Sequence, residues 1–129
     1  MRVLIVDDDQ RNRKLVAGVL ATKFECLAVA SGEEALQAFK NAWDEWRPFT
    51  HILLDIMMPG TTGDEVLRWL RDEEARKRVL KCHQAKIYMV SASSDAEIVK
   101  RCISNQCDGY ILKPISGSML LRKLEGNQI

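Results

Sequence analysis

The chain has 129 residues, of which 47% are hydrophobic and 29% charged, and its 19 basic and 18 acidic residues leave a formal charge of +1. This composition is typical of one globular domain with its own apolar core, and the balanced charge gives no reason to expect nucleic acid or an anionic membrane as a partner. No apolar run approaches the roughly 20 residues that span a bilayer. The start, Met1–Val6, is too short for a signal peptide, so we expect a cytoplasmic protein.

The four cysteines, Cys26, Cys82, Cys102 and Cys107, form no CxxC pair and show no zinc-ligand spacing with the two histidines. We therefore expect reduced thiols that serve as small buried or half-buried apolar residues. A Cys102–Cys107 bridge is the alternative, although it would be unusual in a reducing compartment.

Short apolar runs alternate along the chain with segments whose apolar residues recur at helical spacing, which predicts five strands and five helices. The strands are expected over residues 2–6, 25–30, 51–55, 86–90 and 108–112. The helices are expected to begin after the capping residues Asp9, Ser31, Thr62, Ser94 and Ser116. Such alternation is typical of a parallel sheet with helices on both faces and right-handed connections.

The first helix is expected to turn an apolar face inward, made of Leu15, Val16, Val19 and Leu20. Residues 71–81 are dense in charge, which predicts a solvated helical extension.

Polar side chains follow four of the predicted strands, namely Asp7 and Asp8, Asp55, Ser91 and Lys113. Because parallel strands end at one edge of a sheet, we expect these groups to lie together, at the edge where such folds bind ligands. Two carboxylates about 4 Å apart repel by about 4 kcal/mol at an effective dielectric near 20, so three of them favour a divalent cation. Mg²⁺ typically takes one or two carboxylates and shares a phosphate, and an ammonium with a hydroxyl suits that tetrahedral anion.

With these residues in place, the chain resembles the receiver domain of two-component response regulators, of the single-domain chemotaxis type. The motifs that carry the resemblance are Val6-Asp7-Asp8, Leu54-Asp55-Ile56-Met57-Met58-Pro59-Gly60, Ser91-Ala92 and Tyr110-Ile111-Leu112-Lys113-Pro114. The resemblance covers essentially the whole chain and implies one receiver domain over residues 1–129. The implied fold is a flavodoxin-like (βα)5 three-layer sandwich with the parallel strand order 2-1-3-4-5.

The resemblance also implies a role for each residue at the strand ends. Asp55 would accept a phosphoryl group from a phosphohistidine, in a reaction driven by positioning and charge neutralisation. The metal ligands for Mg²⁺ would be Asp8 directly, Asp7 mainly through water, Asp55, and the backbone carbonyl of Met57. Ser91 and Lys113 would hold the phosphoryl oxygens, and a cis Lys113–Pro114 peptide would point the lysine into the site.

The implied function is a phosphorylation-activated signalling switch rather than a turnover enzyme. Ser91 and Tyr110 would relay phosphorylation to the surface formed by helix four, strand five and helix five. The implied partners are a sensor histidine kinase or a histidine phosphotransfer protein, and a downstream protein target. We expect no direct contact with nucleic acid or membrane, and a monomer or a weak dimer through that same surface.

Two alternatives use the same residues differently. A phosphohydrolase of the haloacid-dehalogenase kind would also use Asp55 and Mg²⁺, but its pattern has a second aspartate where this chain has Met57. A protein-interaction module that is never phosphorylated would leave the acidic set and Lys113 unexplained. Met57 and Ser93 stand where side chains tune the loss of the phosphoryl group, and because Met57 cannot orient an attacking water, we expect a long-lived phosphoaspartate.

Overall fold

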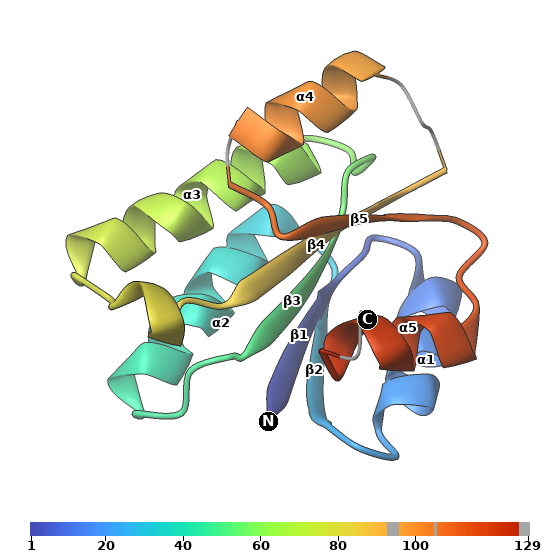
Figure 1. Ribbon diagram of the computed structural model, residues 1–129, viewed down its shortest axis with the longest axis horizontal. Helices are drawn as coiled ribbons and strands as arrows, with labels where there is room; N and C mark the ends of the chain where they lie inside the picture. The colour runs from blue at the N-terminus through green and yellow to red at the C-terminus, as the bar shows by residue number, and fades with distance from the viewer. Residues whose placement is uncertain (93–95, 105, 127–129) are drawn as a thin grey trace.

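The computed structural model describes residues 1–92, 96–104 and 106–126. Its centre is one parallel sheet in the order β2-β1-β3-β4-β5 (Figure 1), which confirms the predicted topology. The strands are β1 (Arg2–Val6), β2 (Glu25–Val29), β3 (His51–Asp55), β4 (Lys86–Ser91) and β5 (Gly109–Leu112). All of β3, and nearly all of β1 and β4, is buried, as expected for strands covered on both faces.

Helices cover both faces of the sheet and complete the predicted three-layer sandwich (Figure 1). They are α1 (Gln10–Leu20), α2 (Gly32–Asp44), α3 (Gly63–Arg76), α4 (Ala96–Ser104) and α5 (Gly117–Leu124), with a short 3₁₀ turn, η1 (Lys81–His83), before β4. One apolar cluster joins α2, α3 and α4 to one face, and a second joins α1 and α5 to the other. Within the described ranges, no helix has the length and apolar character to cross a membrane.

The helices α1, α2, α3 and α5 begin directly after the predicted capping residues, and three of these four residues cap their helix through the side chain. The side chains of Asp9, Ser31 and Ser116 each accept a hydrogen bond from a first-turn amide of α1, α2 and α5. Thr62 makes no such bond, because its hydroxyl lies 3.3 Å from the Glu65 carboxylate and donates to it instead. The predicted cap Ser94, like Ser93, lies outside the described residues.

Leu15 does not belong to the buried face of α1: it is 61% exposed, whereas Val16 and Leu20 are buried. Val16 and Leu20, four residues apart, already face the sheet, and Leu15 points about a third of a helical turn away from them. The four cysteines are free thiols, without a Cys102–Cys107 bridge, and Cys82 is exposed rather than buried.

The prediction of a solvated segment over residues 71–81 is wrong for its first turn. Glu74 is 1% exposed and Glu73 is 6% exposed. Arg71 contacts Glu74 at 2.7 Å and Asp108 at 2.7 Å, and its side chain is only 10% exposed. The sequence pattern does not predict such a buried pair, because a run of alternating charges looks the same whether the partners face water or each other.

Candidate functional site

The strand register brings the predicted site residues to the carboxyl edge of the sheet. Val6 pairs with Leu54 and Asp55 pairs with Val90, so β1, β3 and β4 end almost level and the segments that follow them start at the same edge. Asp55 is 4% exposed at the end of β3, and Ser91 is fully buried at the end of β4. The Lys113 amide donates to the Ser91 carbonyl at 2.9 Å, which fixes the chain just after β5.

Three carboxylates converge there. One oxygen from each of Asp7, Asp8 and Asp55 lies within 4.8 Å of the others. Asp7 and Asp55 are buried, whereas Asp8 is exposed. A cluster with two buried members and one exposed member is open to a cation on one side only.

Within the part of the chain that the structure describes, one ammonium faces this cluster. Lys113 Nζ lies 3.4 Å from Asp55 Oδ2 and 3.8 Å from Asp7 Oδ2. Backbone amides add to it: Met57 N donates to Asp55 Oδ1 at 3.3 Å, and Asp9 N donates to Asp7 Oδ1 at 2.9 Å. A single ammonium cannot neutralise three carboxylates, so the site keeps a deficit of positive charge.

The pKa of Asp55 records this deficit. Burial, and after it the negative charge of Asp7, raise this pKa from 3.8 to about 6, while Lys113 and the Met57 amide lower it. A hard cation with oxygen ligands would remove the repulsion, and Mg²⁺ prefers this donor set. The chemistry of the three carboxylates therefore fits Mg²⁺.

The remaining predicted residues surround the cluster. The peptide between Lys113 and Pro114 is cis. Tyr110 is half-buried on β5 and packs against the apolar cluster beneath α2, α3 and α4. Met57 follows Asp55 by two residues with its side chain 65% exposed.

Two supporting residues were not predicted from the sequence. A Cβ at Gly63 would lie 2.3 Å from the Asp55 carbonyl oxygen, so only glycine lets α3 start this close to the chain at Asp55 and Ile56. Arg13 donates from its guanidinium to the Asp7 carbonyl at 2.7 Å. The signal for Gly63 is its place directly after Thr62 at the start of α3; nothing in the sequence singles out Arg13.

The family model of the response regulator receiver domain matches residues 3–125. The chain belongs to this family. Receiver domains are signalling switches and generally not turnover enzymes, so this assignment replaces the haloacid-dehalogenase alternative.

Known relatives include both single-domain and longer proteins. The polar-differentiation response regulator DivK of Brucella ovis is 33% identical over 115 residues, which cover 88% of this chain and 85% of DivK. A cyclic di-GMP phosphodiesterase of Thermotoga maritima is 30% identical over 96% of this chain, but the chain spans only 30% of that protein.

Solved structures agree with the fold. The chemotaxis protein CheY4 of Vibrio cholerae superimposes with a TM-score of 0.83 at 27% identity, over 97% of this chain and 96% of CheY4. The receiver domain of the histidine kinase CKI1 from Arabidopsis thaliana, solved with Mg²⁺ and BeF₃⁻, superimposes with a TM-score of 0.80 at 27% identity, over 97% and 89% of the two chains.

Proposed function

We propose that this protein is a signalling switch of a two-component phosphorelay in which Asp55 accepts the phosphoryl group. An Asp55 carboxylate oxygen attacks the phosphorus of a phosphohistidine, a new P–O bond forms, and the P–N bond breaks with its electron pair returning to the imidazole. The product is an acyl phosphate on Asp55. The observation that carries this proposal is the deficit of positive charge around a buried carboxylate with an ammonium 3.4 Å away.

Some residues around Asp55 are proposed to bind the phosphoryl oxygens, and others keep the Asp55 carboxylate in position. Lys113 is placed to contact a phosphoryl oxygen as well as Asp55, because its Nζ already lies at this carboxylate. The Ser91 hydroxyl is proposed to hold a second phosphoryl oxygen from the end of β4. The Gly63 contact keeps the loop after Asp55 close to α3, so the carboxylate is oriented before the donor arrives.

Mg²⁺ is the proposed cofactor, held by Asp8, by Asp7 mainly through water, by Asp55 and by the Met57 carbonyl. When bound, it neutralises charge that would otherwise repel an incoming phosphoryl group. Support comes from the carboxylate cluster itself and from the Arabidopsis receiver domain, which was solved with Mg²⁺ and BeF₃⁻.

The proposed output passes through Ser91 and Tyr110 to the surface of α4, β5 and α5. Leu112 on this surface is 49% exposed, so it offers apolar area to a downstream protein or to a second copy in a weak dimer. Replacing Tyr110 with Ala should leave phosphorylation of Asp55 intact and weaken binding of the downstream protein. Unchanged partner affinity would sink this part of the proposal.

The proposed phosphodonor is a sensor histidine kinase or a histidine phosphotransfer protein. The phosphoryl group of such a donor comes from ATP, and because ATP is available in the cytoplasm, we propose that the protein acts there. The proposed receiver domain comprises residues 1–129, within which the family match spans 3–125.

Titration with BeF₃⁻ tests the site without a kinase. In the presence of Mg²⁺, BeF₃⁻ should form a complex at Asp55 that is seen as a new bound ¹⁹F resonance, and the resonance should be lost in Asp55→Asn and when Mg²⁺ is removed by EDTA. A resonance of equal intensity in Asp55→Asn would contradict the proposed acceptor.

A further inference from the structure

Two neighbouring helices, α2 and α3, end in the same way at the amino edge of the sheet, away from Asp55. After α2, Trp46 N donates to Trp43 O at 3.1 Å and Arg47 N to Ala42 O at 2.9 Å. After α3, Arg78 N donates to Ala75 O at 3.1 Å and Val79 N to Glu74 O at 3.0 Å. This is the Schellman arrangement, in which the residue after the C-cap is left-handed and is usually glycine or asparagine.

Here that left-handed position holds Trp46, with a φ of 58°, and Arg78, with a φ of 55°. For a bulky residue this conformation is a genuine outlier. Besides this backbone strain, Trp46 leaves a large apolar ring in water, because 83% of its surface is exposed. Glycine would remove both costs without changing the hydrogen bonds, so neither helix termination nor packing accounts for the tryptophan, and strain kept at a surface position points to a function.

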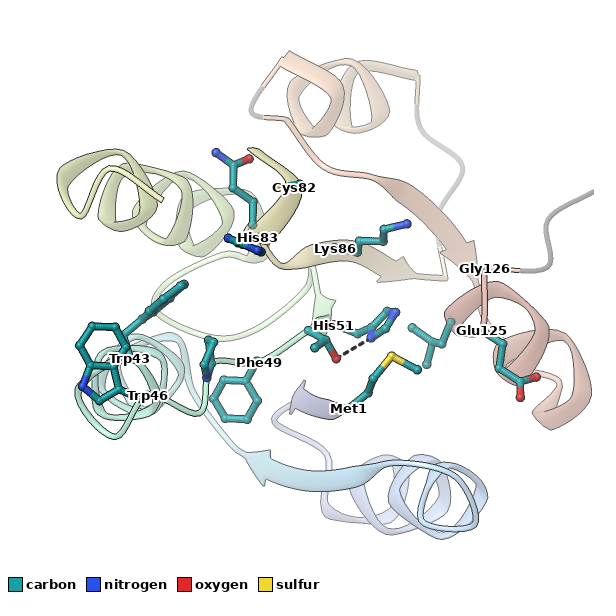
Figure 2. Close-up of a pocket in the computed structure, with 14 residues that line it drawn as sticks. Met1, Trp43, Trp46, Phe49, His51, Cys82, His83, Lys86, Glu125 and Gly126 are labelled. Carbon is teal, nitrogen blue, oxygen red and sulfur yellow. Dashed lines mark hydrogen bonds between the residues drawn. The ribbon is translucent and has the colours of Figure 1, made fainter. Parts of the chain in front are cut away.

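A hollow of about 510 Å³ lies between the two helix ends. Its apolar lining is Trp43, Trp46, Val79 and Leu80, and Leu80 is 64% exposed. An adjoining hollow of about 560 Å³ shares Trp43, Trp46 and His83 and continues past Phe49 toward His51. Figure 2 shows both indoles on the α2 side of this second hollow and His83 across from them, beside η1.

The charge around the first hollow is one-sided. Lys77 and Arg78 line it. Lys77 Nζ lies 3.9 Å from Asp44 and 4.0 Å from the buried Glu73, whereas Arg78 has no carboxylate partner within the described part of the chain. Lys86 lines the adjoining hollow, whose one acidic residue, Glu125, is paired with Lys23 at 2.6 Å. The occupant that complements this surface therefore combines an apolar group with negative charge.

We propose that the hollow between the ends of α2 and α3 docks a segment of a partner protein that inserts an apolar side chain between Trp46 and Leu80 and sets carboxylates beside Lys77 and Arg78. Exposed tryptophan and arginine are the residue types that dominate protein interfaces. A small ligand is disfavoured because much of the apolar area stands exposed on the rim rather than enclosed. A second copy is disfavoured because a two-fold contact would set the two cationic rims against each other.

Selection of short random peptides displayed on phage, with the full chain as bait and counter-selection against Trp46→Gly, tests this directly. Glycine suits the left-handed position, so Trp46→Gly should fold and should raise the midpoint of thermal unfolding. Selected peptides should carry an apolar residue flanked by Asp or Glu. Their affinity, measured by fluorescence polarisation, should fall at least about tenfold in Trp46→Gly and should also fall with added salt.

Charge and matched controls sharpen the result. Arg78→Gly should weaken the peptides and reduce their salt dependence, whereas Arg122→Ala, an exposed arginine on α5, should change neither. Trp46→Phe should recover part of the affinity. The proposal is overturned if no peptide distinguishes the wild type from Trp46→Gly, if the selected peptides lack acidic residues, or if Trp46→Gly instead dissolves a dimer seen by sedimentation.

Discussion

Two charged clusters lie at opposite ends of the same sheet, and they are built on opposite principles. At the amino end, the Arg71 guanidinium contacts Glu74, Asp108 and the carbonyls of Ala85 and Gln106. The other Glu74 oxygen accepts from Ala85 N at 2.8 Å, so Glu74 is buried with both oxygens satisfied. At the carboxyl end, three carboxylates share one ammonium.

The difference separates a structural cluster from a functional one. Where every buried charge has a partner inside the chain, the cluster joins α3 to β4 and to the loop before β5, and it needs nothing from outside. Where negative charge exceeds positive charge, the fold holds an arrangement that only a cation or a proton can relieve. Removing a negative charge should therefore destabilise the first cluster and stabilise the second.

The largest effect is expected at the amino end. Glu74→Ala removes one of the two carboxylates that contact Arg71 and also removes the acceptor of the buried Ala85 amide, so we expect a loss of about 3–5 kcal/mol in the free energy of unfolding. Urea denaturation measures this loss. Asp72→Ala, an exposed acid on the same helix, serves as the control and should stay within about 0.5 kcal/mol of the wild type. A loss for Glu74→Ala as small as that of the control would remove the structural role of this cluster.

The opposite sign is expected for Asp55→Asn. The folded pKa of Asp55, about 6, lies above the ordinary value of 3.8, so the folded state binds more protons between these values and its stability falls as the pH rises through them. Removing the charge should stabilise the metal-free protein by about 2–3 kcal/mol near pH 7.

This gain should disappear below about pH 4, where Asp55 is protonated in both states. Urea denaturation in EDTA at several pH values measures it. A wild type that is as stable as Asp55→Asn near pH 7 would show that the cluster carries no uncompensated charge.

The close contact between Gly63 and Asp55 gives a third contrast. Gly63→Ala would set a methyl group 2.3 Å from the Asp55 carbonyl oxygen, and overpacking of this kind costs about 1–3 kcal/mol. Gly18→Ala is the matched control, since no atom lies within 4 Å of its Cβ, and in α1 alanine should be neutral or stabilising. The midpoint of thermal unfolding should therefore fall for Gly63→Ala and should stay the same or rise for Gly18→Ala. Equal midpoints for the two variants would mean that the chain around Asp55 adapts freely to the added methyl group.

The smallest effect comes from the cation itself. Mg²⁺ at about ten times its dissociation constant should stabilise the protein by about 1.4 kcal/mol at neutral pH. This gain should shrink as the pH falls below about 6, because protonated Asp55 is a poor ligand. Thermal unfolding with MgCl₂, against NaCl of equal ionic strength, measures the difference. If Mg²⁺ stabilised the protein near pH 5 as much as at neutral pH, the bound cation would lie away from Asp55.

The fold and the residues at the strand ends were predictable because both follow from short-range patterns. Apolar runs such as Val3–Val6 and Ile52–Leu54 mark buried parallel strands, and the residue after each strand must lie at the common edge. Glu74 was missed because its burial depends on Ala85 and Asp108, which are distant in sequence. Gly63 was missed because its role is a contact across a loop, and sequence spacing carries no information about such distances.

The most direct test is phosphorylation by a small acyl phosphate donor followed by intact-protein mass spectrometry. With Mg²⁺ present, the wild type should gain the mass of one phosphoryl group, and the gain should be absent in Asp55→Asn and in EDTA. A wild type that gains no mass, or an Asp55→Asn variant that gains the same mass, would contradict the assignment of Asp55 as the phosphoryl acceptor.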